Sequence, residues 1–211
     1  MIWQSRHFRN RNFWYTWNLL NFAIDGLFDW RVSGREHIPM EGPLLVASNH
    51  IALLDPPYVG SCLRREACFV AKKELFAFAP LRALVESYNS IPIRRGGWDS
   101  AVFRTVRKKL DQGWAVIMFP EGTRSRGRGF LPPKPGVGMI ARQSLVPVLP
   151  VCISGTDRPL PQLLARRRPL TAAFGPAMSP AEVGSYPDDK SGYQGLSQAI
   201  MDRIKGLSAG A

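Results

Sequence analysis

At 211 residues, of which 45% are hydrophobic and 21% charged, the chain is long enough to bury a core and too apolar to be disordered. Lysine and arginine outnumber aspartate and glutamate by 28 to 16, which gives a formal net charge of +12. This excess predicts a negatively charged partner and leaves three classes open: nucleic acid, an anionic lipid surface or a phosphorylated substrate.

The first predicted element is an amphipathic helix within residues 1–30, a stretch that lacks the short apolar core of a signal peptide. The uncharged stretch 12–24 is shorter than the ~20 residues that span a bilayer. Tryptophans beside arginines favour a helix that lies in the lipid headgroup region, and the alternative is a terminal helix packed on the core. The apolar stripe of this helix consists of Phe13, Trp17, Leu20, Ile24, Leu27 and Phe28.

From residue 31 onward, short apolar runs alternate with amphipathic segments. This alternation predicts an α/β fold in which helices flank a mostly parallel or mixed central sheet, and we expect residues 31–211 to form a single domain. The predicted strands are Leu44–Ala47, Cys68–Ala71, Ile91–Ile93, Ala115–Phe119, Val148–Ile153 and Leu170–Phe174. The predicted helices lie near 57–64, 74–87, 100–112 and 138–144, with a last helix at the C-terminus.

The three cysteines, Cys62, Cys68 and Cys152, are few, odd in number and mostly flanked by apolar residues. This usage indicates reduced thiols and a cytosolic setting. The chain has no Cys-x-x-Cys pair, and its three histidines are scattered, so we expect no metal site.

Four informative stretches fall between predicted strands and helices, where open α/β sheets bind their ligands. They are 49–55, 91–95, 119–125 and 146–151. In the first of them, His50 and Asp55 would not share a face of one continuous helix, because five residues turn through about 500°. If the chain bends between them, the carboxylate can accept the Nδ1 proton and leave Nε2 free to act as a base.

These four motifs, in this order, resemble those of the glycerolipid acyltransferases. That family carries Asn-His-x4-Asp, a second motif that ends in arginine, Phe-Pro-Glu-Gly-Thr-Arg-Ser, and Val-Pro-x-x-Pro-Val. Asn-His-x4-Asp alone is weak, whereas the seven-residue block at 119–125 is specific by itself. One departure is Asn89, which stands where members often have glycine, and we expect only a local adjustment because asparagine tolerates left-handed backbone.

The resemblance implies transfer of an acyl group from a thioester to a glycerol hydroxyl, with His50 as the general base and Asp55 as the group that orients it. It implies direct attack by the acceptor without an acyl-enzyme, and no Gly-x-Ser-x-Gly motif is present. Glu121 would accept hydrogen bonds from the glycerol or brace an arginine, while Pro147 and Pro150 would shape the acyl site. The expected substrate-binding residues are Lys72, Arg95, Glu121, Gly122, Thr123 and Arg124.

The expected acceptor is a 1-acylglycerol 3-phosphate, and the product is phosphatidic acid. The acyl thioester, of coenzyme A or of acyl-carrier protein, serves as co-substrate, and we expect no cofactor. We also expect attachment to an anionic membrane surface on the cytoplasmic face, with Arg166, Arg167 and Arg168 as exposed basic residues.

Three alternatives remain at this point. The same chemistry can act on glycerol 3-phosphate, another lysophospholipid or an aminolipid. A nucleic-acid-binding module would interleave basic and aromatic residues on one surface, whereas here the aromatics concentrate near the N-terminus, so no nucleic acid is expected. A membrane-bound scaffold with an inactive site is disfavoured because the histidine, both acidic residues and both arginines of the motifs are retained.

Overall fold

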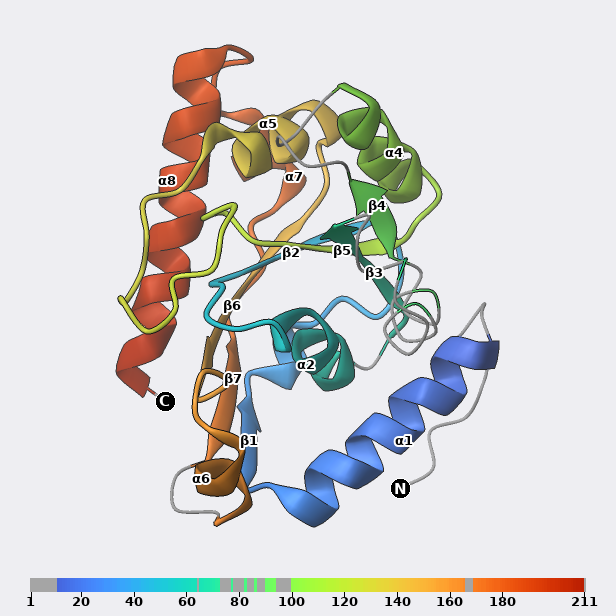
Figure 1. Ribbon diagram of the computed structural model, residues 1–211. Coiled ribbons are helices and arrows are strands. Elements are labelled where there is room, and N and C mark those ends of the chain that lie inside the picture. Colours follow the sequence, from blue (N-terminus) through green and yellow to red (C-terminus); the bar gives the residue numbers. More distant parts are fainter. Residues whose placement is uncertain are drawn as a thin grey trace.

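A computed structural model describes residues 11–63, 65–72, 77, 82, 86, 90–93, 100–165 and 169–210. Its centre is a seven-stranded sheet in the order β1-β7-β6-β2-β5-β3-β4 (Figure 1). The strands are β1 (Trp30–Ser33), β2 (Leu44–Ser48), β3 (Ala67–Lys72), β4 (Ile91–Ile93), β5 (Ala115–Met118), β6 (Val148–Ser154) and β7 (Leu170–Phe174). All six predicted strands are present, and β1 is an additional one.

The sheet is mixed, as the sequence allowed. Strands β6, β2, β5, β3 and β4 run parallel to one another. β7 is antiparallel to β6, and β1 lies parallel to β7 at the edge of the sheet. The carboxyl ends of β2, β5, β3 and β4 therefore share one edge of the sheet. The first and third sequence motifs follow β2 and β5 at this edge, and the second motif begins with β4 itself.

Helices lie on both faces of this sheet (Figure 1). Five predicted helices, the N-terminal one included, are present with small shifts at their ends, and the one near 74–87 falls almost wholly outside the described residues. Two short helices, α6 and α7, were not predicted. The helices are α1 (Arg11–Leu27), α2 (Asp55–Cys62), α4 (Ser100–Asp111), α5 (Pro135–Ser144), α6 (Leu160–Leu164), α7 (Pro180–Gly184) and α8 (Lys190–Gly206), with 3-10 turns at Arg35–His37 and Leu207–Gly210.

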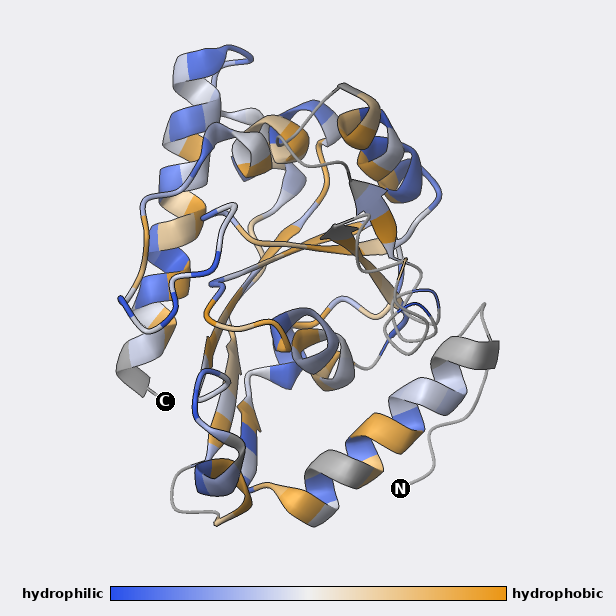
Figure 2. Cartoon of the chain, in the orientation of Figure 1, coloured by the Kyte–Doolittle hydropathy of each residue, from blue (hydrophilic) through white to orange (hydrophobic). Residues whose placement is uncertain are grey.

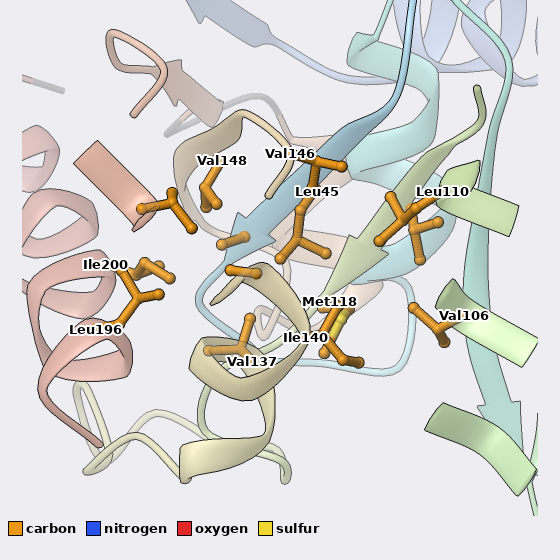
Figure 3. Close-up of a cluster of buried hydrophobic side chains, with 14 of the residues drawn as sticks. Leu45, Val106, Leu110, Met118, Val137, Ile140, Val146, Val148, Leu196 and Ile200 are labelled. Carbon is orange, nitrogen blue, oxygen red and sulfur yellow. The ribbon is translucent and has the colours of Figure 1, made fainter. Parts of the chain in front are cut away.

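Alternate residues of the central strands enter two separate hydrophobic clusters, because side chains on a strand point to opposite faces. On β2, Leu44 and Val46 join the cluster beneath α1 and α2. Leu45 and Ala47 join the cluster formed with α4, α5 and α8, part of which is seen in Figure 3. Burial on both faces explains why these strands read as continuous apolar runs in the sequence.

The apolar stripe predicted on the N-terminal helix faces the protein rather than solvent. Trp17 is 8% exposed and its indole Nε1 donates a hydrogen bond to the carbonyl of Leu63 at 3.2 Å. Leu20 and Phe28 pack partly buried against the same cluster, whereas Leu27 is half exposed. The interpretation of this stripe as the lipid-facing side is therefore wrong for Trp17, Leu20 and Phe28, three of its four described members. For this face, the alternative of a helix packed on the core is correct.

A second apolar face of α1 remains in solvent. Tyr15, Leu19 and Phe22 are 58%, 69% and 78% exposed, and spacings of four and three residues place them on one side of the helix. Hydrophobic residues recur along α1 in Figure 2. None of the helices in the described part of the chain is both long and apolar enough to span a bilayer.

Candidate active site

Two of the sequence motifs meet where β2 and β5 end. β2 ends at Ser48, so that Asn49 and His50 follow at its carboxyl end, and the 119–125 motif follows β5 in the neighbouring position. Lys72 is the last residue of β3, and Arg95 comes two residues after β4. The backbone of Lys72 thus lies at this edge of the sheet, while Arg95 lies outside the described residues.

The predicted contact between His50 and Asp55 is present. Their Nδ1 and Oδ2 atoms are 2.7 Å apart, and the side chains are 17% and 0% exposed. The chain bends at Ile51 and Ala52, whose N–H groups donate to the same Oδ2 at 2.5 and 2.8 Å. Asp55 opens α2, and the two prolines that follow it have a fixed φ that suits the first turn of a helix.

This geometry sets the tautomer of the neutral ring. A carboxylate accepts and does not donate, so the Nδ1 of His50 carries the proton and Nε2 keeps its lone pair. Among the described residues, His50 is the only basic side chain within ion-pair distance of Asp55. The buried carboxylate of Asp55 is therefore placed to fix the tautomer and the orientation of the His50 ring.

The 119–125 loop contacts His50 at three points. The His50 N–H donates to Oε1 of Glu121 at 2.9 Å, and the His50 carbonyl accepts from the N–H of Ser125 at 2.7 Å. The ring of Phe119 stacks on the imidazole, with ring centroids 4.1 Å apart and planes inclined by 21°. The ring and both polar backbone groups of His50 are therefore held by one loop.

Glu121 is buried, and both of its carboxylate oxygens bind backbone. Its Oε2 accepts from the N–H of Leu131 at 3.2 Å, its Oε1 is bound to His50, and the residue is 2% exposed. Burial raises the pKa of the Glu121 carboxyl, and the hydrogen bonds from His50 and Leu131 oppose that shift. These two backbone N–H partners are not revealed by the sequence pattern, and the binding of a glycerol hydroxyl by Glu121 stays a prediction.

Asn49, which had no role assigned from the sequence, links β2 to β6. Its Nδ2 donates to the carbonyl of Ile153 at 3.0 Å, and its Oδ1 accepts from the N–H of Ile153 at 2.8 Å. The backbone pairing of these strands ends at Ser48 opposite Val151, so the side-chain amide continues it by one step. No local signal in the sequence reveals this contact, because Asn49 and Ile153 are 104 positions apart.

The remaining predicted residues of this loop are open to solvent. Gly122 and Thr123 are exposed, and Arg124 is half-buried. Gly122 has a φ of +65°, which suits glycine, and a Cβ there would lie 3.0 Å from Cδ and 3.4 Å from Nζ of Lys134. The space beside Gly122 is thus occupied by a lysine side chain, a neighbour that sequence reasoning did not identify.

The fourth motif is a strand rather than a loop. Val148 to Val151 lie within β6, and Pro147 precedes that strand, at the edge of the sheet opposite His50. Pro150 is buried, and its carbonyl accepts from the N–H of Gly175 at 3.0 Å. Pro147 thus lies at the edge of the sheet away from His50, and the expectation that both prolines shape the acyl site stays a prediction.

No group of three histidine, cysteine or acidic side chains that could hold a metal occurs in the described part of the chain. The three cysteines are free and buried. Burial raises the pKa of the thiols, to about 12 for Cys62 and Cys68 and to about 11 for Cys152. These thiols are protonated at neutral pH and poorly suited to nucleophilic catalysis.

Comparison with known proteins gives concordant matches. A family model described as Acyltransferase matches residues 29–154. A 1-acyl-sn-glycerol-3-phosphate acyltransferase of Limnanthes douglasii is 32% identical over 148 residues, which cover 66% of this chain and 52% of that protein. A protein of the same name from Bacillus subtilis (strain 168) is 25% identical over 178 residues, which cover 84% and 87%.

Among solved structures, the crystal structure of the 1-acyl-sn-glycerophosphate (LPA) acyltransferase PlsC from Thermotoga maritima is similar, with a TM-score of 0.72 and 26% sequence identity. The match covers 97% of this chain and 86% of that one. The chain spans about half the length of the Limnanthes relatives that it matches, at 52% of each.

Proposed function

The chain belongs to the Acyltransferase family, whose model covers residues 29–154, and from this premise we propose that it is a 1-acylglycerol-3-phosphate O-acyltransferase. It would move a fatty acyl group from a thioester of coenzyme A or acyl-carrier protein to the sn-2 hydroxyl of its acceptor, which gives phosphatidic acid. The observation that supports this most directly is the 2.7 Å contact between His50 and Asp55 beside the 119–125 loop. The names of the similar proteins support the choice of acceptor.

In the proposed reaction, Nε2 of His50 takes the proton of the acceptor hydroxyl as its oxygen attacks the thioester carbonyl. The carbon–sulfur bond then breaks, and the imidazolium returns the proton to the departing sulfur. An alcohol is a weak nucleophile at neutral pH, and general base catalysis of this kind contributes about 10²-fold to 10⁴-fold. Asp55 keeps the proton on Nδ1 and stabilises the imidazolium during transfer.

The acceptor phosphate would bind to cations at the carboxyl edge of the sheet. Arg124 lies in the loop that holds His50, Lys72 ends the neighbouring strand β3, and Arg95 closely follows β4. Arginine binds phosphate oxygens in a bidentate manner, which suits it to this role. Gly122 and Thr123, both exposed, would present the backbone of the loop to the acceptor.

The acyl chains would meet apolar surface near the base. Leu53 and Leu54 are 50% and 60% exposed in the turn between His50 and Asp55. The exposed face of α1, formed by Tyr15, Leu19 and Phe22, would enter the headgroup region of an anionic membrane. The net charge of +12 supports this attachment, and the free, buried cysteines favour the reducing, cytoplasmic side.

An acyl-transfer assay with the purified chain tests the proposal. Lysophosphatidic acid is the acceptor, with glycerol 3-phosphate and a lysophospholipid that bears a further headgroup as comparison acceptors, each with an acyl-coenzyme A and an acyl-carrier-protein donor. We expect phosphatidic acid from lysophosphatidic acid and little product from the other two. Turnover of either comparison acceptor at a higher kcat/KM would overturn the assignment of the acceptor.

A further inference from the structure

The structure assigns Glu121 and Asn49 as the positioning residues of His50, an inference that rests on the proposed function. Glu121 would not bind the acceptor. The two side chains fix the short segment between the end of β2 and Asp55 from opposite directions, one from the loop after β5 and the other from strand β6.

The contacts of Glu121 leave it poorly suited to hold a substrate. Each of its oxygens already accepts a backbone N–H, from His50 at 2.9 Å and from Leu131 at 3.2 Å. At 2% exposure the residue offers almost no surface to an acceptor. A hydrogen bond to a carboxylate is stronger than one between neutral groups, so the bond to the His50 N–H is a firm constraint on that peptide.

The loop that carries Glu121 is itself closed at its base. The N–H of Lys134 donates to the carbonyl of Pro120 at 2.9 Å, and the bond from Leu131 to Glu121 crosses the loop inside that closure. The Glu121 carboxylate therefore connects His50 to a loop whose own conformation is stabilised by hydrogen bonds. The bond from the Ser125 N–H to the His50 carbonyl, at 2.7 Å, adds a second tie between the same two segments.

Asn49 acts on the same segment from the other side of β2. Its amide binds both the N–H and the carbonyl of Ile153, at 2.8 and 3.0 Å, and the residue is 5% exposed. Only an amide supplies an acceptor and a donor in this orientation. Aspartate at this position would place a second oxygen against the Ile153 carbonyl and lose one of the two bonds.

Positioning and substrate binding predict different kinetics. A residue that only places the base changes kcat, because a displacement of about 1 Å costs on the order of 10²-fold in rate. A residue that holds the acceptor equally in the ground state and in the transition state changes KM instead. The two roles are thus separable by substitution at Glu121.

The test compares Glu121→Gln and Asn49→Asp with Glu182→Gln, a substitution on the exposed Glu182–Arg203 ion pair. For the first two variants we expect kcat to fall by about 10²-fold with the KM for lysophosphatidic acid unchanged, and for the control no change. A raised KM with an unchanged kcat in Glu121→Gln, or wild-type kinetics in both site variants, would overturn the inference. If Glu121→Gln does not fold, Asn49→Asp decides in the same way.

A second readout does not depend on activity. The backbone amide proton of His50 donates to a carboxylate in the wild type, so its NMR resonance should move upfield in Glu121→Gln and stay in place in Glu182→Gln. An unmoved resonance would refute the contact even in an active enzyme. If the wild type does not acylate lysophosphatidic acid, the proposed function is wrong. The comparison of the His50 amide resonance between wild type and variant still tests the positioning role of Glu121.

Discussion

At the residue scale, Glu121 combines a charge with nearly complete burial. The carboxyl groups of the site have separate tasks, since Asp55 binds the imidazole while Glu121 binds only backbone among the described residues. Desolvation raises the pKa of the Glu121 carboxyl above its ordinary 4.5, and the two backbone hydrogen bonds limit that rise.

This shift predicts a pH dependence of stability. Because the pKa is higher in the folded state than in the unfolded state, the native protein holds a proton in a pH window where the unfolded chain has lost it. The contribution of Glu121 to the free energy of unfolding is fully present below pH 4.5. It is lost as the pH rises through the pKa that Glu121 has in the folded protein. Glu121→Gln cannot titrate, so the free energy of unfolding of the wild type minus that of the variant should fall with rising pH.

Urea unfolding of both proteins at a series of pH values from 4.5 to neutrality measures this difference. A difference that stays constant across the series, or that grows as the pH rises, would show that the pKa of Glu121 is not raised in the folded protein.

At the element scale, α1 has two apolar faces with separate partners. One contains Trp17, which packs on the core, and the other contains Tyr15, Leu19 and Phe22, which are exposed. Sequence periodicity identified the helix and the first face. It did not show which side faces the protein, because tryptophan and leucine suit a lipid boundary and a protein core equally well.

The second face predicts a membrane-binding variant with an unaltered fold. Leu19→Ser together with Phe22→Ser should reduce sedimentation with phosphatidylglycerol vesicles, since it removes exposed apolar surface that would insert into the headgroup region. Leu164→Ser is the matched control, because Leu164 is 45% exposed on a different helix, α6. Stability should change little in all of these variants, as is usual for exposed positions.

Wild-type binding should also weaken with added salt, because part of the attraction comes from the basic surface. If the double variant sediments with vesicles as the wild type does, the exposed face of α1 is not the membrane contact.

At the scale of the whole molecule, the fold was largely readable from the sequence and the contacts of the site were not. The strands Ile91–Ile93 and Leu170–Phe174 have the predicted bounds. In Leu170–Phe174 all residues but Thr171 are buried, which suits a strand covered on both faces. Strand β1 was missed because it is a four-residue edge strand in which half-buried and exposed residues alternate. Asn49 and Ile153 are 104 positions apart, and no local pattern predicts a side chain that pairs with backbone at that separation.

All three cysteines are buried in the fold, which predicts how they react with a thiol reagent. With thiol pKa values raised to about 12, 12 and 11 for Cys62, Cys68 and Cys152, little thiolate forms at pH 8, and the buried sulfurs are inaccessible. We therefore expect that a thiol reagent such as Ellman's reagent labels the cysteines of the folded protein no faster than the protein unfolds. In concentrated urea the same reagent should label all three cysteines. Rapid labelling of any cysteine in the native protein would contradict this burial.

The central claim is that His50 is the base and that Asp55 acts through it. The most direct test is the rate of phosphatidic acid formation by His50→Ala, Asp55→Asn and the double variant, with circular dichroism to verify folding. Each single variant should lose about 10²-fold to 10⁴-fold in kcat. Groups that act as one unit are not additive, so the double variant should be no slower than His50→Ala. Retained turnover in a folded His50→Ala variant, or fully additive losses in the double variant, would contradict the claim.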